Sequence, residues 1–473
     1  MYAHDRSRKV HDAPQILRFP EEFIWGVGSS SHQMEGNTTN NQWHAWEERG
    51  GILSGDRAGL ACDWWNNAEE DFDRAREMGV NGIRISLEWS RLEPEEGRWD
   101  DAAFARYRQM LRGLQRRGIE PLVTLHHFTE PLWLARDGGF ASAKSPLYFE
   151  RYAAKCVEEL GDLCDFWCTV NEPNVYVGLG YLLGLFPPGR KNALLTTMRV
   201  LSNLLRAHAG AYHAIHARQS HARVGLAHHI CLFDPGQENA PLDKLLASVC
   251  DVATNDLVLD ALTRGRFRGG LHLLSGDLSG VRDTFDYIGV NYYYRLMVGL
   301  NFYRQSQQET QAARATQATH AASTSLVGTA AENPDDQMDA GSMGDLRVIY
   351  PDGIGRALRK VAGLGRPIYV TENGFADASD AKRPSALLRT LTALQQEIEQ
   401  GLDVRGYYHW SLVDNFEWVD GWSINFGLIA LDPLTQKRTL RPSAELYGRI
   451  CRANALTPDI LDQYMPAPLI PVG

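Results

Sequence analysis

Eight short apolar runs punctuate the chain and predict eight β-strands. They span residues 24–28, 82–87, 121–126, 165–170, 223–227, 287–291, 367–371 and 404–410. Apolar runs of this length, rich in β-branched and aromatic residues, are typical of strands that are buried on both faces. Such strands belong to parallel sheets whose two faces are covered by helices or by a core.

The segments between these runs predict helices, because their apolar residues recur at three- and four-residue spacing. One helix follows Asp100, and its apolar face consists of Phe104, Tyr107, Leu111 and Leu114. A second opens with Ser145 as its N-cap and Pro146 in its first turn, and it closes at Gly161. A third covers residues 387–398 and is stopped by Gly401.

Strands that alternate with helices form a parallel sheet, and eight such strands close into a barrel. The predicted fold class is therefore α/β, a single-domain (β/α)8 TIM barrel over residues 19–455. In that fold the chemistry lies at the carboxyl ends of the strands. The polar residues that interrupt the apolar runs fall at these ends: Arg84, His127, Asn171, Glu172, Asn291 and Glu372.

Three segments do not fit the barrel pattern. Residues 1–18 form a polar N-terminal extension, and the proline-rich tail at 456–473 is predicted to lie extended on the surface. Residues 304–345 follow the sixth strand and are rich in Gln, Ala, Thr, Ser and Asp, which predicts a loop over the barrel mouth. Whether that loop touches a ligand is left open by the sequence.

The composition narrows the range of partners. The 473 residues carry a net charge of -10 with both signs interspersed, which argues against nucleic acid or an anionic membrane as a partner. No apolar stretch is long enough to cross a membrane, and the polar N-terminus lacks a secretory signal. The 7 cysteines include no C-x-x-C pair. A reduced, cytoplasmic protein is predicted, and its oligomeric state is left unknown.

Two glutamates stand in closely similar surroundings about two hundred residues apart. Glu172 ends a β-branched run and precedes Pro173, and Glu372 ends another such run with Gly374 two positions later. Each carboxylate is therefore expected where a buried strand delivers a side chain to the barrel mouth. Two carboxylates that converge on one cleft from distant strands are the groups that cleavage of a glycosidic bond requires.

Seven motifs follow one another along almost the whole chain. They lie at residues 23–26 with 33–36, 84–86 with 89–91, 127–128 with 131, 169–173, 291–293, 370–374, and 410–412 with 414–418. In this order they resemble glycoside hydrolase family 1, the β-glucosidase family, from Phe23 to about Tyr447. The resemblance implies a small-molecule or oligosaccharide β-glycoside as the substrate. No cofactor is expected.

The resemblance also implies a role for each matched residue. Glu172 would be the acid/base and Glu372 the nucleophile of a retaining mechanism. Arg84, Asn291 and Tyr293 would support them. The residues that would bind the sugar are Gln33, His127, Asn171, Trp410, Glu417 and Trp418. Amides, an imidazole and a carboxylate suit hydroxyls that both donate and accept hydrogen bonds, and the indoles offer flat apolar faces to the C–H surface of the ring.

The two glutamates must differ in protonation at one pH. Arg84 beside the nucleophile would favour an ionised Glu372, and Tyr293 would donate a hydrogen bond to it. Glu172, near that charge in a dry pocket, is expected to keep its proton. Once Glu372 is esterified its charge disappears, so Glu172 ionises more easily and can act as the base for water.

Three positions depart from the usual family pattern: Phe128 replaces a tryptophan, His126 a tyrosine and His229 an asparagine. These changes point to an altered aglycone side or altered sugar tolerance, and the direction is left open. Glu417 disfavours 6-phosphorylated sugars, because a buried carboxylate would repel the phosphate. A glutamate at 172 disfavours a myrosinase-like enzyme, which carries glutamine there.

Adjacent histidines at 126–127 and 228–229 raise the alternative of a metal site. Neighbours on a strand point to opposite faces, so neither pair is suited to hold one ion, and no metal is predicted. The sequence thus predicts a hydrolase of terminal β-D-glucosides, with β-galactosides or β-fucosides as further substrates. Two rival hypotheses are a transglycosidase and a catalytically inactive barrel that binds glycans or a partner protein.

Overall fold

Eight parallel strands close into a barrel in the order β12-β13-β2-β3-β4-β5-β6-β8. The computed structural model describes residues 16–300, 327–328 and 348–465. The barrel strands are β2 (Ile24–Gly28), β3 (Gly82–Ser86), β4 (Glu120–His126), β5 (Phe166–Asn171), β6 (Arg223–His229), β8 (Tyr287–Asn291), β12 (Ile368–Asn373) and β13 (Val404–His409). All eight predicted strands and the TIM barrel are confirmed.

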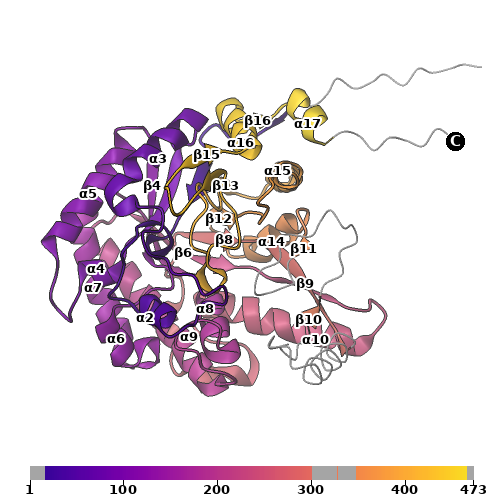
Figure 1. The fold of residues 1–473 in the computed structure, drawn as a ribbon. Helices are drawn as coiled ribbons and strands as arrows, with labels where there is room; N and C mark the ends of the chain where they lie inside the picture. Colours follow the sequence, from indigo (N-terminus) through magenta and orange to yellow (C-terminus); the bar gives the residue numbers. More distant parts are fainter. Residues whose placement is uncertain (1–15, 301–326, 329–347, 466–473) are drawn as a thin grey trace, which may run out of the picture.

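Helices surround the strands on the outside of the barrel (Figure 1). The longer ones are α3 (Trp64–Met78), α5 (Asp101–Gln115), α7 (Ser145–Leu160), α9 (Leu194–His216), α10 (Pro241–Asp251), α11 (Leu257–Arg264), α14 (Gly353–Ala362), α15 (Arg383–Glu399) and α16 (Pro442–Ala453). Shorter helices precede or follow strands: α1 (Ser31–Met34), α2 (Gln42–Glu48), α4 (Trp89–Leu92), α6 (Leu132–Arg136), α8 (Pro173–Val177) and α12 (His272–Ser275). No helix among the described residues is both long and apolar enough to cross a membrane.

The three helices predicted from periodicity are confirmed as α5, α7 and α15, with one correction at a helix start. Asp100 caps α5, because its carboxylate accepts a hydrogen bond from the Ala103 N–H at 2.9 Å. Ser145 was expected to cap α7 but is the first residue of that helix, after Lys144. Its hydroxyl donates instead to the Ser142 carbonyl at 2.8 Å, because the chain already turns at Ser142.

Two apolar cores hold the barrel. The larger lies between the strands and the helices. A small separate cluster comes only from barrel strands and fills the interior, as in other barrels of this size: it consists of Ile24, Leu122, Phe166, Cys168, Ala227, Tyr287, Tyr369 and Tyr408. The inner tyrosines fit because glycines face them. A Cβ added at Gly26, for example, would lie 2.2 Å from Cδ1 of Tyr408.

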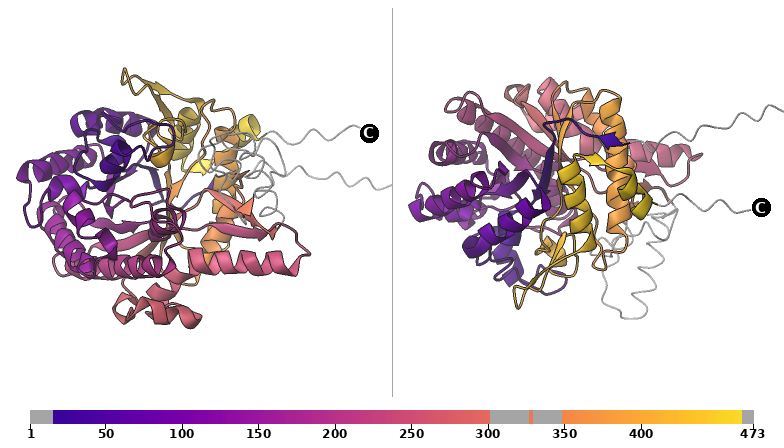
Figure 2. Two further views of the ribbon diagram at one scale, coloured as in Figure 1. Left: turned by 60° about the horizontal axis from the view of Figure 1, so that its bottom comes forward. Right: turned by 90° about the horizontal axis from the view of Figure 1, so that it is seen from above.

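The two ends of the described chain meet on one side of the barrel. Strand β1 (Leu17–Arg18) pairs antiparallel with β16 (Ala455–Leu456). Figure 2 shows this pair beside α15 and α16. The prediction of an extended tail is wrong for α17 (Pro458–Tyr464), because Pro458 occupies the first turn of a helix and Ile460 is buried. Residues 1–15 and 466–473 lie outside the described residues.

A small second sheet stands beside the barrel after β6 and β8 (Figure 1). Its strands are β7 (Leu232–Pro235), β9 (Tyr294–Val298), β10 (Val327–Gly328) and β11 (Val348–Ile349), with β9 paired to each of the others. Of the predicted loop at 304–345, only β10 lies within the described residues, so its predicted position over the barrel mouth stays a prediction.

The close packing inside the barrel gives a stability prediction. Gly26→Ala would drive a methyl group into the Tyr408 ring, and we expect the free energy of unfolding to fall by about 1–3 kcal/mol. The control is Gly113→Ala within α5, where the new Cβ lies 3.4 Å from the flexible Glu69 side chain. That change should raise stability by about 0.5–1 kcal/mol. Denaturant unfolding measures both, and an unchanged Gly26→Ala midpoint would contradict the packing.

Candidate active site

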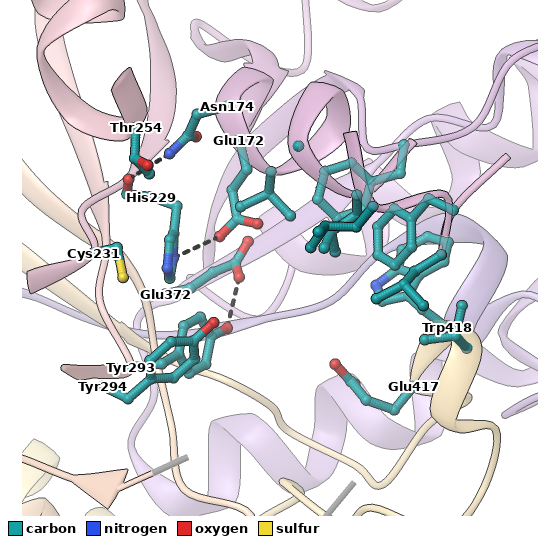
Figure 3. A pocket seen from close by; sticks show the side chains of 18 of the residues that line it. Glu172, Asn174, His229, Cys231, Thr254, Tyr293, Tyr294, Glu372, Glu417 and Trp418 are labelled. Carbon is teal, nitrogen blue, oxygen red and sulfur yellow. Dashed lines mark hydrogen bonds and ion pairs between the residues drawn. The ribbon is translucent and has the colours of Figure 1, made fainter. Parts of the chain in front are cut away.

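A cavity of about 390 Å³ opens at the carboxyl ends of the barrel strands, and both predicted glutamates line it. Glu172 is the first residue after β5, and Glu372 is the next-to-last residue of β12. Their side chains point toward one another in the middle of the cavity (Figure 3). Both are almost fully buried, with 6% and 3% of their surfaces exposed. The expected convergence of two distant strand ends on one cleft is therefore present.

Glu372 is held from two sides. The fully buried Arg84 guanidinium on β3 contacts one carboxylate oxygen, and the Tyr293 hydroxyl donates to the other at 2.7 Å. Arg84 is itself fixed, because it donates to the Asn171 amide oxygen at 2.7 Å and to the Thr124 hydroxyl at 3.0 Å. Each donor of this guanidinium thus has a named acceptor, which leaves Glu372 little freedom to turn.

Glu172 has different neighbours. The Asn291 amide donates to its carboxylate at 2.8 Å, and the Nδ1 atom of His229 lies 3.4 Å from the same oxygen. The backbone of Glu172 is in the left-handed region (φ 45°, ψ 61°), where it turns β5 directly into α8. From that helix the Asn174 amide donates to the His229 carbonyl at 2.8 Å. The turn therefore fixes the carboxylate and the imidazole relative to each other.

A chain of hydrogen bonds joins the two glutamates behind the cavity. Asn171 accepts from Arg84 on one side and from the Asn291 amide, at 3.0 Å, on the other. Asn291 in turn donates to Glu172, while Arg84 contacts Glu372. The three linking residues, Arg84, Asn171 and Asn291, come from β3, β5 and β8. The barrel itself therefore sets the separation of the two carboxylates.

The protonation order differs from the sequence-based expectation. Burial raises the pKa of Glu372 to about 7, although the Arg84 charge acts against this rise. Burial acts in the same direction on Glu172, but the contacts with His229 and Asn291 outweigh it and lower the pKa of that carboxyl. The physical reason is His229, which the sequence marked only as a departure from a family pattern. Its imidazole attracts the carboxylate when it is itself protonated.

Four of the six predicted sugar-binding residues line the cavity: His127, Trp410, Glu417 and Trp418. The His127 ring stacks on Trp410 (centroids 5.7 Å apart, planes at 23°) and on Trp418 (6.0 Å, 18°). Burial, then the nearby Arg84 charge, lowers the pKa of His127 far below its ordinary value, so the imidazole is neutral. A neutral ring can donate from one nitrogen and accept at the other.

Gln33 and Asn171 lie behind that first layer of side chains. Both are fully buried. The Gln33 amide donates to Asn415 at 2.8 Å and to Glu417 at 3.1 Å, so it orients a carboxylate that lines the cavity. The Asn171 amide nitrogen lies 3.1 Å from Nε2 of His127. These two amides therefore contact other predicted binding residues, Glu417 and His127.

The three departures from the family pattern have different surroundings. Phe128 and His229 line the cavity. His126 packs instead against Phe140, Phe149 and Tyr176, on the other side of its strand from His127. Phe128 (φ 66°) and the cavity residue Trp418 (φ 51°) share the left-handed backbone of Glu172.

Sequence reasoning missed two features of the site. One is the contact of His229 with Glu172, and the other is a set of leucines after α8 that lines the cavity mouth. His229 had a signal, because it is the second member of the histidine pair at 228–229 and ends strand β6. The leucines gave no such signal in the sequence, because their pattern is that of an ordinary apolar helix.

Comparison with known proteins places the chain among one set of enzymes. The family model described as glycosyl hydrolase family 1 matches residues 15–456. Beta-glucosidase A of Thermotoga maritima is 29% identical, covering 93% of this chain and 99% of the relative. A β-galactosidase of Saccharolobus solfataricus is 30% identical, covering 94% and 97%. The solved β-glycosidase from Pyrococcus horikoshii is 35% identical, with a TM-score of 0.81 and coverage of 96% and 99%.

The buried Arg84 contact gives a pH-dependent stability prediction. Without Arg84 the pKa of Glu372, already raised from 4.5 to about 7, would rise further. Above pH 7 the folded variant then keeps a proton that the unfolded chain has released, so its stability continues to fall as the pH rises, whereas below pH 4.5 the carboxyl is protonated in folded and unfolded chains alike. Arg84→Met should therefore lower the free energy of unfolding by about 3–5 kcal/mol at pH 8 and by less at pH 5.

Denaturant unfolding at the two pH values measures this difference. The control is Arg98→Met, because Arg98 pairs with Glu95 at 3.0 Å with both side chains 70% exposed. Exposed pairs contribute about 0–1 kcal/mol, so the control should change little at either pH. Equal losses for Arg84→Met at pH 5 and pH 8 would contradict the role of the Arg84 charge.

Proposed function

Since the chain belongs to glycosyl hydrolase family 1, we propose that it cleaves terminal β-D-glycosides with retention, through a covalent glycosyl-enzyme intermediate. It is a glycoside hydrolase of the β-glucosidase type, with β-glucosides and β-galactosides as its substrates. The observation that carries the mechanistic proposal is the pair of buried glutamates that face each other across one cavity. Retaining enzymes need two carboxyl groups close together, because one attacks the sugar directly.

Glu372 is the nucleophile in this proposal. Both of its oxygens are held, one by Arg84 and one by Tyr293, so the attacking atom is oriented before the sugar arrives. An attacking group that is already held in place loses less entropy on the way to the transition state, so the activation barrier is lower. Glu172 has a hydrogen bond to one oxygen only, from Asn291, which leaves a proton-carrying oxygen free to face the substrate.

The reaction then has two steps with one proton moving back and forth. In the first, Glu172 gives its proton to the glycosidic oxygen while the Glu372 carboxylate attacks the anomeric carbon and the aglycone leaves as an alcohol. In the second, Glu172 takes a proton from water, the water oxygen attacks the same carbon, and the ester to Glu372 breaks. Two inversions give net retention.

In this proposal one proton is carried by either Glu172 or Glu372, and the charge on His229 determines which of the two carries it. A protonated imidazole 3.4 Å from Glu172 favours a negative Glu172 and leaves the proton on Glu372, the unproductive arrangement. A neutral imidazole removes that attraction, and Arg84 then favours a negative Glu372 with the proton on Glu172. The productive state is therefore the one with neutral His229.

The remaining cavity groups support an unmodified sugar. Glu417, oriented by Gln33, places a carboxylate where a 6-phosphate would be repelled. Trp410 and Trp418 present the flat faces that a pyranose ring needs. A transglycosidase would share this first step, and products formed with an added alcohol distinguish it. An inactive binding barrel is disfavoured by the complete set of contacts around both glutamates.

Removal of the nucleophile tests the mechanism through its stereochemistry. Glu372→Gly should abolish turnover of a p-nitrophenyl β-glucoside, because no group remains to attack the anomeric carbon. Added azide should restore turnover by entering the space of the lost side chain, and the product should be the α-glycosyl azide. NMR of the product gives the configuration, and azide should not accelerate the unaltered enzyme. Recovery of a β-glycosyl azide would contradict the role of Glu372.

Removal of the acid tests the role of Glu172 through the leaving group. Glu172→Gln should lower kcat/KM for alkyl β-glucosides by about 10²–10⁴, because their leaving alkoxides need a proton. The loss should be much smaller for 2,4-dinitrophenyl β-glucoside, whose phenolate leaves without one. Steady-state kinetics on the two substrates gives both values. Equal losses on both would argue against a protonating role.

A further inference from the structure

The mouth of the cavity is lined by aliphatic side chains from one short segment. Helix α8 continues into a π-helix, η2 (Gly178–Leu183), and the chain leaves it through Gly184 in the left-handed region (φ 69°). The side chains of this segment that line the cavity form what we call the aliphatic wall: Val175, Leu179, Leu182, Leu183 and Leu185. The wall ends at Phe186, whose ring packs 6.2 Å from that of Trp418.

The aliphatic wall stays partly open to solvent. None of its five side chains is fully buried, and Leu183 is 51% exposed. Full burial of one leucine side chain contributes about 1.5–3 kcal/mol, so several partly exposed aliphatic side chains that line one cavity leave a gain in free energy for an apolar ligand. Cys231, Phe233 and Leu296 also contribute apolar lining to the cavity.

Besides the glutamates and the predicted sugar-binding residues, the polar side chains that line the cavity are Asn174, Thr254, Tyr293, Tyr294, His229 and Asp420. Next to the wall, the Asn174 amide nitrogen donates to the His229 carbonyl, and its Oδ1 is one buried acceptor without a hydrogen-bond partner among the described residues. In the view of Figure 3, Glu417 and Trp418 lie on the opposite side of the glutamate pair from His229 and Cys231. A second sugar at the wall would bring several hydroxyls against leucines, and each unmatched one costs about 1–3 kcal/mol.

The wall also has a fixed position relative to the reacting bond. Val175 stands three residues after Glu172, on the helix that begins at that glutamate. If Glu172 protonates the glycosidic oxygen, as proposed above, the departing group lies next to this helix. The aliphatic wall therefore faces the aglycone and not the sugar that is cleaved off.

We propose that the aglycone of the preferred substrate is a hydrocarbon chain, so that the enzyme hydrolyses β-glycosides of aliphatic alcohols in preference to oligosaccharides. This inference rests on the proposed function, because it needs the sugar in the part of the cavity lined by Trp410 and Glu417. It goes beyond that function by assigning the chemical class of the leaving alcohol.

A series of alkyl β-D-glucosides, kept below their micelle concentrations, tests the inference against cellobiose. From methyl to octyl, kcat/KM should rise roughly two- to fourfold for each added methylene until the chain outgrows the wall. Octyl β-glucoside should exceed cellobiose by at least about a hundredfold, since several methylenes are buried. Equal or better cleavage of cellobiose would overturn the inference while the proposed function stood. Failure to cleave any glucoside would instead refute the proposed function.

Variants of the aliphatic wall test whether its side chains cause the dependence of kcat/KM on alkyl chain length. Leu182→Gln and Leu179→Gln should each reduce the octyl-to-methyl ratio of kcat/KM by about tenfold or more and leave the methyl value near that of the unaltered enzyme. The methyl value also reports that each variant folds. The matched control is Leu273→Gln on α12, where the leucine is 77% exposed and does not line the cavity. An octyl-to-methyl ratio that stays constant in both wall variants would overturn the assignment.

Discussion

The buried guanidinium of Arg84 is the constraint on which the site depends. A charge with no exposed surface is tolerated only if acceptors surround it, and here these are Glu372, Asn171 and Thr124. Because Asn171 passes the chain of hydrogen bonds on to Asn291, the same interaction also positions Glu172. Arg84 therefore links the strands that carry both carboxylates to the cavity.

Within that frame the two glutamates have different neighbours. Two buried carboxyls in one cavity do not both ionise readily, and each contacts a different basic side chain, Arg84 for Glu372 and His229 for Glu172. Arg84 is permanently charged and favours charge on Glu372, whereas His229 exerts its attraction on Glu172 only in its protonated form. The site therefore places a permanently charged group against Glu372 and an imidazole against Glu172.

The sequence predicted the barrel because the strands are short, mostly apolar runs, several of which end in a polar residue, and such runs are usually buried. It predicted Glu172, Glu372, Arg84 and Tyr293 through motifs that lie at those ends. It failed where the outcome depends on segments meeting in space. His229 reaches Glu172 from the neighbouring strand, and the protonation order follows from that contact. The apolar run after α8 gives no local sign that it faces a cavity and not a core.

Glu172, Phe128 and Trp418 all hold the left-handed backbone around one cavity. Residues with side chains adopt this conformation at a cost on the order of 1–3 kcal/mol each, so the backbone around the cavity is strained at these positions. The remainder of the barrel has to supply that energy from its own packing. Selection for higher stability is therefore opposed here: ordinary backbone at these positions would be more stable, but it would no longer direct the Glu172 carboxylate toward Glu372.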